Sequence, residues 1–343
     1  MRSFVCAVVG FVALLCASVT VQASTLVKVK AKGFVQCGVS EGLAGFSEPV
    51  DGVWHGIDVD LCRAVAAAIF GDPSKVNFTP LSAADRFTAL AKGDIDILSR
   101  NSTWTIAHDI RDGVNFVGTY YYDNQGFMLP ADLNIRSVLE LSNAKICVGR
   151  GTTAVLNVQD FFADRNMEIE LVEYDSHKVL QADYEAGKCH AYAADISRLY
   201  SARQSFAEPE KHIILQDSIS KEPLGPAVQT GDEIWFDLVK WVMFALINAE
   251  ELEVSSANVD QMRESGNSAV RRLLGLEGDF GSSLGLDREE YDGNDWAYNA
   301  IKAVGNYGEI YDRHLGPEGV VSIPRNANQL WSKGGLLYAP PIR

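Results

Sequence analysis

Strands and helices alternate along two separate stretches of the chain, and this order constrains the fold more than any other feature. In the first stretch the expected elements are a strand over 33–39, a helix over 57–70, a strand over 76–78, a helix over 83–92 and a strand over 95–98. In the second they are a strand over 145–149, a helix opened by 151–153, a helix over 179–186 and a strand over 189–194. This order favours parallel sheets with helices on their faces, so we expect an α/β protein with two lobes.

The remainder of the chain, from Asp232 onward, is expected to be mostly helical. Its apolar spacing predicts helices over 235–249, 259–274 and 295–315. At about 100–200 residues per domain, a chain of 343 residues has room for two lobes with substantial cores.

The first 23 residues have the pattern of an export signal. Arg2 supplies a positive charge, residues 4–17 are apolar, and residues 21–23 (VQA) place small side chains before a cleavage site at Ser24. A membrane anchor is the alternative, but the apolar run is shorter than the ~20 residues that span a bilayer. We therefore expect residues 1–23 to be a cleaved signal peptide and the mature protein to be soluble.

Charge and residue spacing exclude several classes of function. The formal net charge of −15 repels phosphate backbones, so no nucleic-acid partner is expected. The chain has no C-x-x-C spacing and its six histidines are not clustered, which predicts no metal and no cofactor. No P-loop, G-x-S-x-G or H-E-x-x-H motif is present, so we do not expect an enzyme.

Four cysteines follow the export signal: Cys37, Cys62, Cys147 and Cys189. An even number in an oxidising compartment favours disulfides over a zinc site. Three pairings are possible, and we favour Cys37–Cys62 with Cys147–Cys189 because each pair then lies within one strand–helix–strand unit. Four buried free thiols are the alternative.

Seven short motifs carry a resemblance to a known family. They are residues 56–61 (GIDVDL), 93–98 (GDIDIL), 100–108 (RNSTWTIAH), 148–153 (VGRGTT), 193–195 (AAD), 220–226 (SKEPLGP) and 301–309 (IKAVGNYGE). With these motifs in this order, the chain resembles the periplasmic solute-binding proteins of ABC importers for polar amino acids. It is most similar to their general L-amino-acid-binding branch, and the likeness covers essentially the whole mature chain.

The resemblance implies a two-lobed type II periplasmic binding protein fold (a Venus flytrap) with an extended helical C-terminal region. Residues 24–128 and 226–343 would form the first lobe, residues 129–225 the second, and the crossings would fall near 127–130 and 224–227. The implied function is capture of free L-amino acids in the periplasm for delivery to inner-membrane permease subunits. Polar or acidic ligands such as Glu, Gln, Asp or Asn are expected, with a broad range as an alternative, and a monomer is expected.

The ligand of such a site is a zwitterion, which needs donors for its carboxylate and acceptors for its ammonium. Gly151, Thr152 and Thr153 open a helix, so their backbone N–H groups suit a carboxylate. The alternative is an ordinary Thr N-cap. The resemblance assigns Asp195 to the ammonium, although a solvated loop acid is the alternative for that residue. Asn101, Ser102 and Thr103 are expected to supply further oxygens to the ammonium.

Two positions depart from the family pattern. His108 stands where the family usually has an arginine that clamps the ligand carboxylate, and Leu43 stands where many relatives have an aromatic residue. If His108 contacts the carboxylate, attraction would raise its pKa and affinity would fall from about pH 6 to pH 8. Arg100, Arg111 or Arg150 could instead supply the missing charge, and Arg100 or Arg150 could meet a polar ligand side chain.

Two other functions remain open on the sequence. Some relatives with this fold dehydrate small carboxylic acids, so a cyclohexadienyl-dehydratase-like periplasmic enzyme is one alternative. The other alternative is a sensory binding module whose cleft has lost its transport ligand. The departure from the family pattern at His108 is the reason for considering it.

Overall fold

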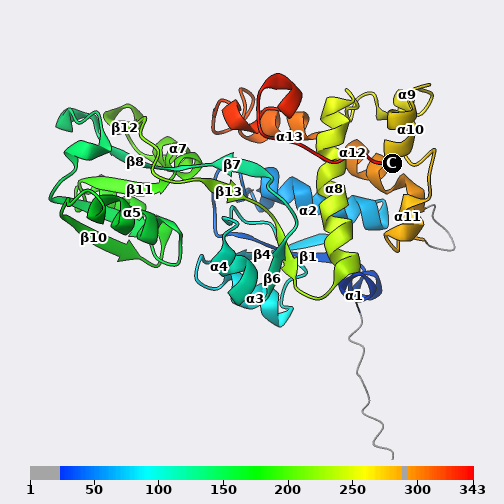
Figure 1. Cartoon of the computed structure of the whole chain (residues 1–343), viewed down its shortest axis with the longest axis horizontal. Coiled ribbons are helices and arrows are strands. Elements are labelled where there is room, and N and C mark those ends of the chain that lie inside the picture. Colours follow the sequence, from blue (N-terminus) through cyan, green and yellow to red (C-terminus); the bar gives the residue numbers. More distant parts are fainter. Residues whose placement is uncertain (1–23, 288–292) are drawn as a thin grey trace, which may run out of the picture.

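A computed structural model describes residues 24–287 and 293–343 of the chain. The expected signal peptide, residues 1–23, lies outside the described residues. Within the described part, no helix combines the length and apolar character that crossing a membrane requires. Figure 1 shows two lobes side by side, a smaller one built from the middle of the chain and a larger one built from both ends.

The sheet of the larger lobe, called the first lobe below, has five strands in the order β4-β1-β5-β14-β6. They are β1 (Val35–Ser40), β4 (Val76–Leu81), β5 (Ile97–Leu98), β6 (Val114–Phe116) and β14 (Ala227–Gln229). Helix α2 (Ile57–Phe70) packs into the main core of this lobe, and α3 (Arg86–Lys92) packs into a separate core with β5, β6 and β14. The sequence predicted this helix correctly, and it is buried on all sides, because every residue of α2 except Arg63 and Phe70 is buried.

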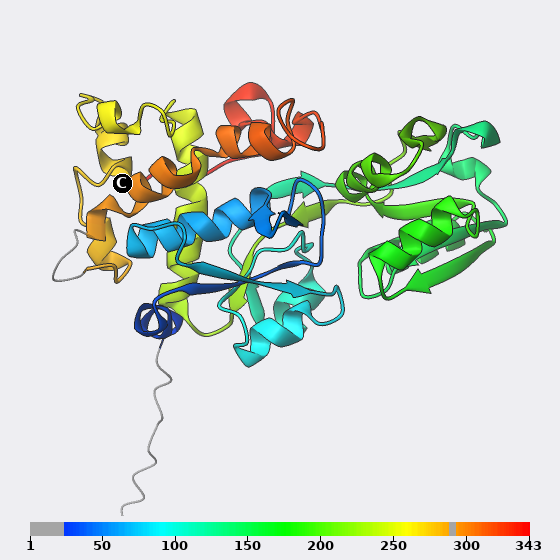
Figure 2. The same ribbon diagram turned by 180° about the vertical axis from the view of Figure 1, so that it is seen from behind.

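The second lobe also has a five-stranded sheet, in the order β10-β9-β11-β8-β12. The strands are β8 (Gln125–Pro130), β9 (Ala144–Gly149), β10 (Ile169–Tyr174), β11 (Ala191–Asp195) and β12 (His212–Ile214). Alternate residues of β9 and β11 enter two cores, one shared with α5 (Ala154–Ala163) and one with α6 (His177–Glu185) and α7 (Ile196–Ser205). Helices therefore cover both faces, as Figure 2 shows from behind.

Both sheets are mixed, so the expectation of parallel sheets was only partly right. The β4-β1-β5 and β10-β9-β11 strands are parallel. However, β14 is antiparallel to β5, and β8 is antiparallel to β11. The reason is that β8 and β14 come directly after the chain has crossed from one lobe to the other, so they enter their sheets from the opposite end.

The lobes are joined by β7 (Tyr121–Asp123) and β13 (Glu222–Leu224), which pair with each other antiparallel. The first crossing was expected near 127–130, which is wrong, because those residues lie within β8 in the second sheet. The boundary expected at residue 128 therefore falls inside the second lobe. The second crossing lies where β13 ends, three residues before β14 begins.

In the C-terminal region, further helices pack around α8 (Glu233–Glu251) and α2. The helix expected over 259–274 is two helices, α9 (Val259–Met262) and α10 (Ser268–Leu273). The helix expected over 295–315 is also two, α12 (Trp296–Val304) and α13 (Tyr307–His314), because Gly305 adopts φ 85° and Asn306 caps the second. The remaining α-helices and strands are α1 (Thr25–Lys32), α4 (Ile106–Arg111), α11 (Phe280–Ser283), β2 (Glu48–Val50) and β3 (Val53–His55).

The last segment of the chain fastens the crossing strand β7 to the first lobe. The Asn328 side chain accepts the Tyr122 N–H at 2.7 Å and donates to the Tyr122 carbonyl at 3.0 Å. Arg325 donates to the carbonyl of Asn328. Its guanidinium also forms a bidentate ion pair with Glu250 of α8, at 2.7 and 2.9 Å. Tyr307 of α13 donates to the carbonyl of Tyr120 at 2.8 Å. The residues before the crossing are thus held by the helical extension.

Two disulfides cross-link the lobes internally. Cys37 of β1 pairs with Cys62 of α2, and Cys147 of β9 pairs with Cys189 just before β11. Both predicted pairings are confirmed. Each bridge ties a central strand to an adjacent part of its own lobe.

Candidate functional site

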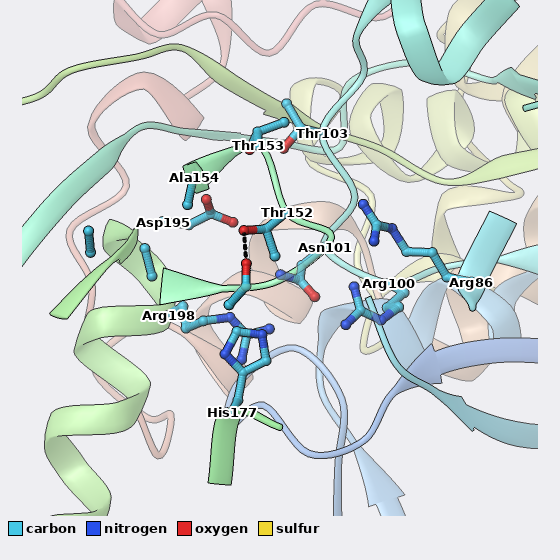
Figure 3. A pocket seen from close by; sticks show the side chains of 13 residues that line it. Arg86, Arg100, Asn101, Thr103, Thr152, Thr153, Ala154, His177, Asp195 and Arg198 are labelled. Atoms are coloured by element: carbon cyan, nitrogen blue, oxygen red, sulfur yellow. Dashed lines mark hydrogen bonds between the residues drawn. The ribbon is translucent and has the colours of Figure 1, made fainter. Parts of the chain in front are cut away.

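A pocket lies between the two lobes, at the carboxyl ends of the central strands (Figure 3). The free space among its side chains, together with the open solvent at its mouth, is about 430 Å³. The first lobe lines it with Arg86, Arg100, Asn101 and Thr103, and the second with Gly149, Thr152, Thr153, Ala154, His177, Ala193, Ala194, Asp195 and Arg198. Nine of these thirteen residues are polar or charged, and the other four are glycine or alanine.

The lobes touch on more than one side of this pocket. Arg86 Nη1 donates to the carbonyl of Gly151 across the gap at 3.1 Å, and Ser201 Oγ donates to the carbonyl of Ala44 at 2.8 Å. Gly151 has φ 73°, and a Cβ there would lie 3.3 Å from the backbone of Ala84. Glycine thus allows both the turn that opens α5 and the close approach of the lobes.

Three arginines around the pocket are almost fully buried. Arg86, Arg100 and Arg198 expose 4%, 4% and 5% of their surface. Among the ion pairs within residues 24–287 and 293–343, none involves these three side chains. Burial lowers the pKa of Arg86 to about 10 and holds the pKa of Arg100 well below its usual value. Asp195 acts on Arg86 and Asp58 on Arg100 only as nearby charges. Buried cations that lack a direct ion pair are costly, which is typical of a site that receives an anion.

Acidic groups occupy the opposite wall and the hinge. Burial raises the pKa of Asp195 well above its usual value, and the nearby carboxylates of Asp123 and Glu222 raise it further. Burial likewise raises the pKa of Asp58 to about 7, although its carboxylate accepts the Asn101 N–H at 3.2 Å. A cation placed beside a buried carboxyl of this kind stabilises the ionised form of the carboxyl.

Glu222, in the crossing strand β13, organises the hydroxyls of both lobes. It accepts hydrogen bonds from Thr103 Oγ1 at 2.6 Å and Thr153 Oγ1 at 2.9 Å. It also accepts from Asn157 Nδ2 at 2.8 Å and from the Ser220 hydroxyl. The hinge is therefore bonded directly to the residues that line the pocket.

Most of the predicted site residues come together in this pocket. Arg100, Asn101, Thr103, Thr152, Thr153 and Asp195 all line it. Gly151 borders it through its carbonyl contact with Arg86. Ser102 lies behind it, fully buried, with its hydroxyl donating to the carbonyl of Arg100 at 2.6 Å.

Arg150 does not line the pocket, so the structure gives no support to its predicted contact with the ligand. Its guanidinium pairs with Glu173 at 3.2 Å and Asp175 at 2.8 Å, and half of its side chain is exposed. Arg111, the other alternative, is exposed at the end of α4. The physical reason is local, since surface carboxylates next to Arg150 offer it partners without desolvation.

His108 also points away from the predicted role. Its ring packs on Phe87 with the centroids 4.4 Å apart, and its Nδ1 lies 3.0 Å from the carbonyl oxygen of Thr103. Burial lowers its pKa, whereas a raised pKa was predicted only for contact with a ligand carboxylate. Arg86, whose guanidinium lies 4.4 Å from the centre of the same Phe87 ring, lines the pocket instead.

Replacing His108 with Phe is therefore expected to leave the affinity for an amino acid within about threefold of the wild type. The aromatic packing on Phe87 is kept, and only a contact with the Thr103 carbonyl is lost. Calorimetric titration from pH 6 to pH 8 checks this, with Arg150→Gln as a surface control. A large loss of affinity that appears as pH rises would instead restore His108 as a carboxylate ligand.

Sequence reasoning missed Arg86, His177 and Arg198. All three stand in the first turn of a helix that follows a strand, at the start of α3, α6 and α7. Such positions lie at the edge of the sheet where ligands bind in open α/β folds, so this signal could have found them.

Among the described residues, no group of three or more His, Cys, Asp or Glu side chains could hold a metal ion.

Comparison with known proteins places this architecture in a family. A family model described as bacterial extracellular solute-binding proteins, family 3, matches residues 35–317. The general L-amino acid-binding periplasmic protein AapJ of Rhizobium johnstonii is 52% identical over 98% of both chains. The glutamate/glutamine/aspartate/asparagine-binding protein BztA of Rhodobacter capsulatus is 46% identical over 94% of both chains.

A solved structure agrees with the fold and the length of the chain. It is an ABC transporter/periplasmic binding protein from Brucella ovis with glutathione bound, 50% identical, with a TM-score of 0.90. The match covers 94% of the present chain and 100% of that one, so the helical C-terminal region is shared. The protein belongs to family 3 of the bacterial extracellular solute-binding proteins and has their two-lobed type II periplasmic binding protein fold.

Proposed function

We propose that this protein is the periplasmic substrate-binding component of an ABC importer and that it captures free L-α-amino acids. The observation that carries the proposal is that one pocket between the two lobes holds both a carboxylate acceptor and cationic and N–H donors. An amino-acid zwitterion needs both kinds of partner close together, because its carboxylate and its ammonium are attached to the same carbon.

The α-carboxylate would lie against Arg86 and the N-terminus of α5. The first N–H groups of a helix have no partner within the helix, and its dipole favours an anion there. Arg86 already contacts the carbonyl of Gly151 at this end, so its guanidinium is positioned beside the same N–H groups. Its Nε is buried and has no hydrogen-bond partner among the described residues.

The ammonium would lie between Asp195 and Asn101. The Asn101 Oδ1 atom is buried without a hydrogen-bond partner in the described part of the chain. Buried polar atoms of this kind are rare unless a ligand or water completes them. The two acceptors come from different lobes, so the ligand would help to hold the lobes together.

Closure would occur by bending at the paired strands β7 and β13. We take residues 24–124 with 226–343 as the first lobe and 125–225 as the second, which follows the two sheets. The relatives named above are binding proteins, which supports capture rather than catalysis. Delivery to inner-membrane permease subunits, a periplasmic location and a monomeric state are parts of this proposal.

Thermal-shift screening against L- and D-amino acids tests the function. A ligand that binds only the folded state raises the melting temperature, by mass action worth about 2.7 kcal/mol at a hundredfold excess over Kd. We expect shifts with several L-amino acids and one site per chain in calorimetry. Shifts with sugars or with dicarboxylates that lack an ammonium, and none with any amino acid, would refute the proposal.

A further inference from the structure

We propose that the C-terminal segment 325–328 fixes the position of the hinge, and that Asn328 is a positioning residue for ligand binding. The lobes then rotate about the Tyr122–Asp123 step of β7 and the Glu222–Pro223 step of β13. This inference rests on the proposed function, and it gives a role in binding to a segment that does not line the pocket.

One side chain closes the outer edge of β7. This strand pairs with β13 on one side only, and there Tyr122 lies opposite Pro223. The Tyr122 N–H and carbonyl both bond with the Asn328 amide, at 2.7 and 3.0 Å. An amide that supplies both an acceptor and a donor stands in for the neighbouring strand that an edge strand lacks. Asn328 is 4% exposed, so water does not compete for these bonds.

Asn328 is itself fastened to the body of the first lobe. Its carbonyl accepts hydrogen bonds from Arg325 Nε at 3.1 Å and Nη2 at 2.9 Å. The same guanidinium holds Glu250 of α8 in an ion pair whose side chains are only 12% and 8% exposed. It also lies over the rings of Tyr307 and Tyr311 of α13. The planar guanidinium thus fixes Asn328 to two helices at once.

The next residue along β7 is bound to the other lobe. The Asp123 carboxylate accepts the Ser197 N–H of α7 at 3.3 Å. The Ile196 N–H of the same helix donates to the carbonyl of Asn124 at 2.8 Å. Tyr122 and Asp123 are therefore adjacent in the chain but attached to different lobes. Any rotation between the lobes must be absorbed by the few backbone dihedrals at this step.

The second crossing changes lobes at the same level. The carbonyl of Pro223 accepts the Trp104 N–H of the first lobe at 2.8 Å, whereas the Glu222 carboxylate also takes bonds from the second lobe. Pro223 is the pairing partner of Tyr122, and Glu222 is the partner of Asp123. The two steps therefore lie side by side across the strand pair and define one axis.

A hinge fixed in this way loses little freedom when a ligand closes it. Without the Asn328 bonds, the Tyr122 backbone would gain freedom in the open protein and lose it again when a ligand holds the lobes together. Fixing the backbone of one residue corresponds to a factor of about 5 to 30 in an equilibrium constant. Asn328→Ala should raise Kd by about that factor, equally for each amino acid that binds, because no ligand contact changes.

The test combines calorimetry with a distance measurement on the full-length mature protein. L-glutamate and L-glutamine are the probes for Kd. Spin labels on Lys28→Cys and Lys178→Cys, an exposed position in each lobe, report the distance between the lobes by pulsed electron paramagnetic resonance. Cysteines 37, 62, 147 and 189 are all bridged, so the labels react at the introduced positions. We expect Asn328→Ala to broaden the distance distribution without ligand, and saturating ligand to restore the wild-type width.

Three further variants locate the effect. Glu250→Gln weakens the anchor of Arg325 without touching β7, so it should give a smaller change in the same direction. Gln329→Ala removes a neighbouring amide, and Asp295→Asn weakens an ion pair with Arg263 elsewhere in the first lobe. Both controls should stay within about twofold of the wild-type Kd.

The possible results distinguish a hinge role from a structural one. A lower melting temperature of Asn328→Ala with unchanged Kd and distance distribution would overturn this inference, since Asn328 would then stabilise only the fold. A change in the ratio of the two Kd values would also overturn it, because the hinge acts on every ligand alike. If Asn328→Ala does not fold, Glu250→Gln carries the same test. If the wild type binds no amino acid, the proposed function fails, and the ligand-free distance distributions still test the hinge.

Discussion

Asp195→Asn is expected to raise the Kd for an L-amino acid by about 100- to 1,000-fold. Asp195 lines the pocket and is the acid that we propose as partner of the ligand ammonium. Removing one partner of an enclosed charge pair costs about 2–5 kcal/mol. Asparagine keeps the shape of the side chain but not its charge, so the loss reports the electrostatic contact. Isothermal titration calorimetry measures the change, with Asp175→Asn, a carboxylate on the surface of the same lobe, as the matched control.

The same contact predicts a pH dependence whose sign follows from the raised pKa of Asp195. Burial, then Asp123 and Glu222, favour the protonated carboxyl in the ligand-free pocket. Only the ionised form attracts an ammonium, so affinity should fall as pH falls through this raised pKa, and binding should release a proton. In Asp195→Asn this component should disappear. A variant that binds as tightly as wild type at every pH would show that the ammonium lies elsewhere.

Removal of either disulfide is expected to lower the free energy of unfolding by about 3–4 kcal/mol. The bridged cysteines are separated by 25 and 42 residues, so each bridge restricts a long loop in the unfolded chain. The double variants Cys37→Ala/Cys62→Ala and Cys147→Ala/Cys189→Ala test the two lobes separately, because each bridge lies within one of them. Alanine avoids placing a new polar atom in cores where these sulfurs are at most 3% exposed.

Urea denaturation with and without a reducing agent provides the measurement. Reduction should shift the wild-type midpoint downward, and a variant that lacks both bridges should show no further shift. If the midpoints of both double variants match the oxidised wild type, the bridges do not contribute to stability as proposed. Ligand affinity is a useful second readout, since neither bridge touches the pocket and both should leave it nearly unchanged.

Much of the fold was predictable because its signals are local. The spacing of apolar residues in α2 and the glycine that ends it depend on a single helix, and the prediction matched the structure. The break at Gly305 was missed because apolar residues on both sides keep a helical spacing through it, although the positive φ and the Asn306 cap separate two helices. The crossing at β7 was misplaced because nothing local distinguishes a strand between lobes from the strand that follows it.

In the candidate site, too, some residues could be predicted from the sequence and others could not. Residues at strand ends, such as Asp195 and Thr103, could be assigned from the sequence because the carboxyl edge of a sheet gathers them whatever the packing. Arg86, Arg150 and His108 could not, because each has a choice of partners that only folding resolves. Arg150 finds surface carboxylates, His108 finds Phe87 and the Thr103 carbonyl, and Arg86 reaches Gly151 of the other lobe.

The sequence by itself thus predicted most of the α/β elements, favoured the two disulfide pairings that form, and indicated the edge of the sheets where the candidate site lies. Tertiary structure alone decided which cations face the pocket, because that depends on the desolvation of long side chains and on contacts between residues such as Arg86 and Gly151, 65 positions apart in the chain. A local sequence pattern depends on one helix or strand, whereas the position of a buried charge depends on all the residues that surround it in the folded protein.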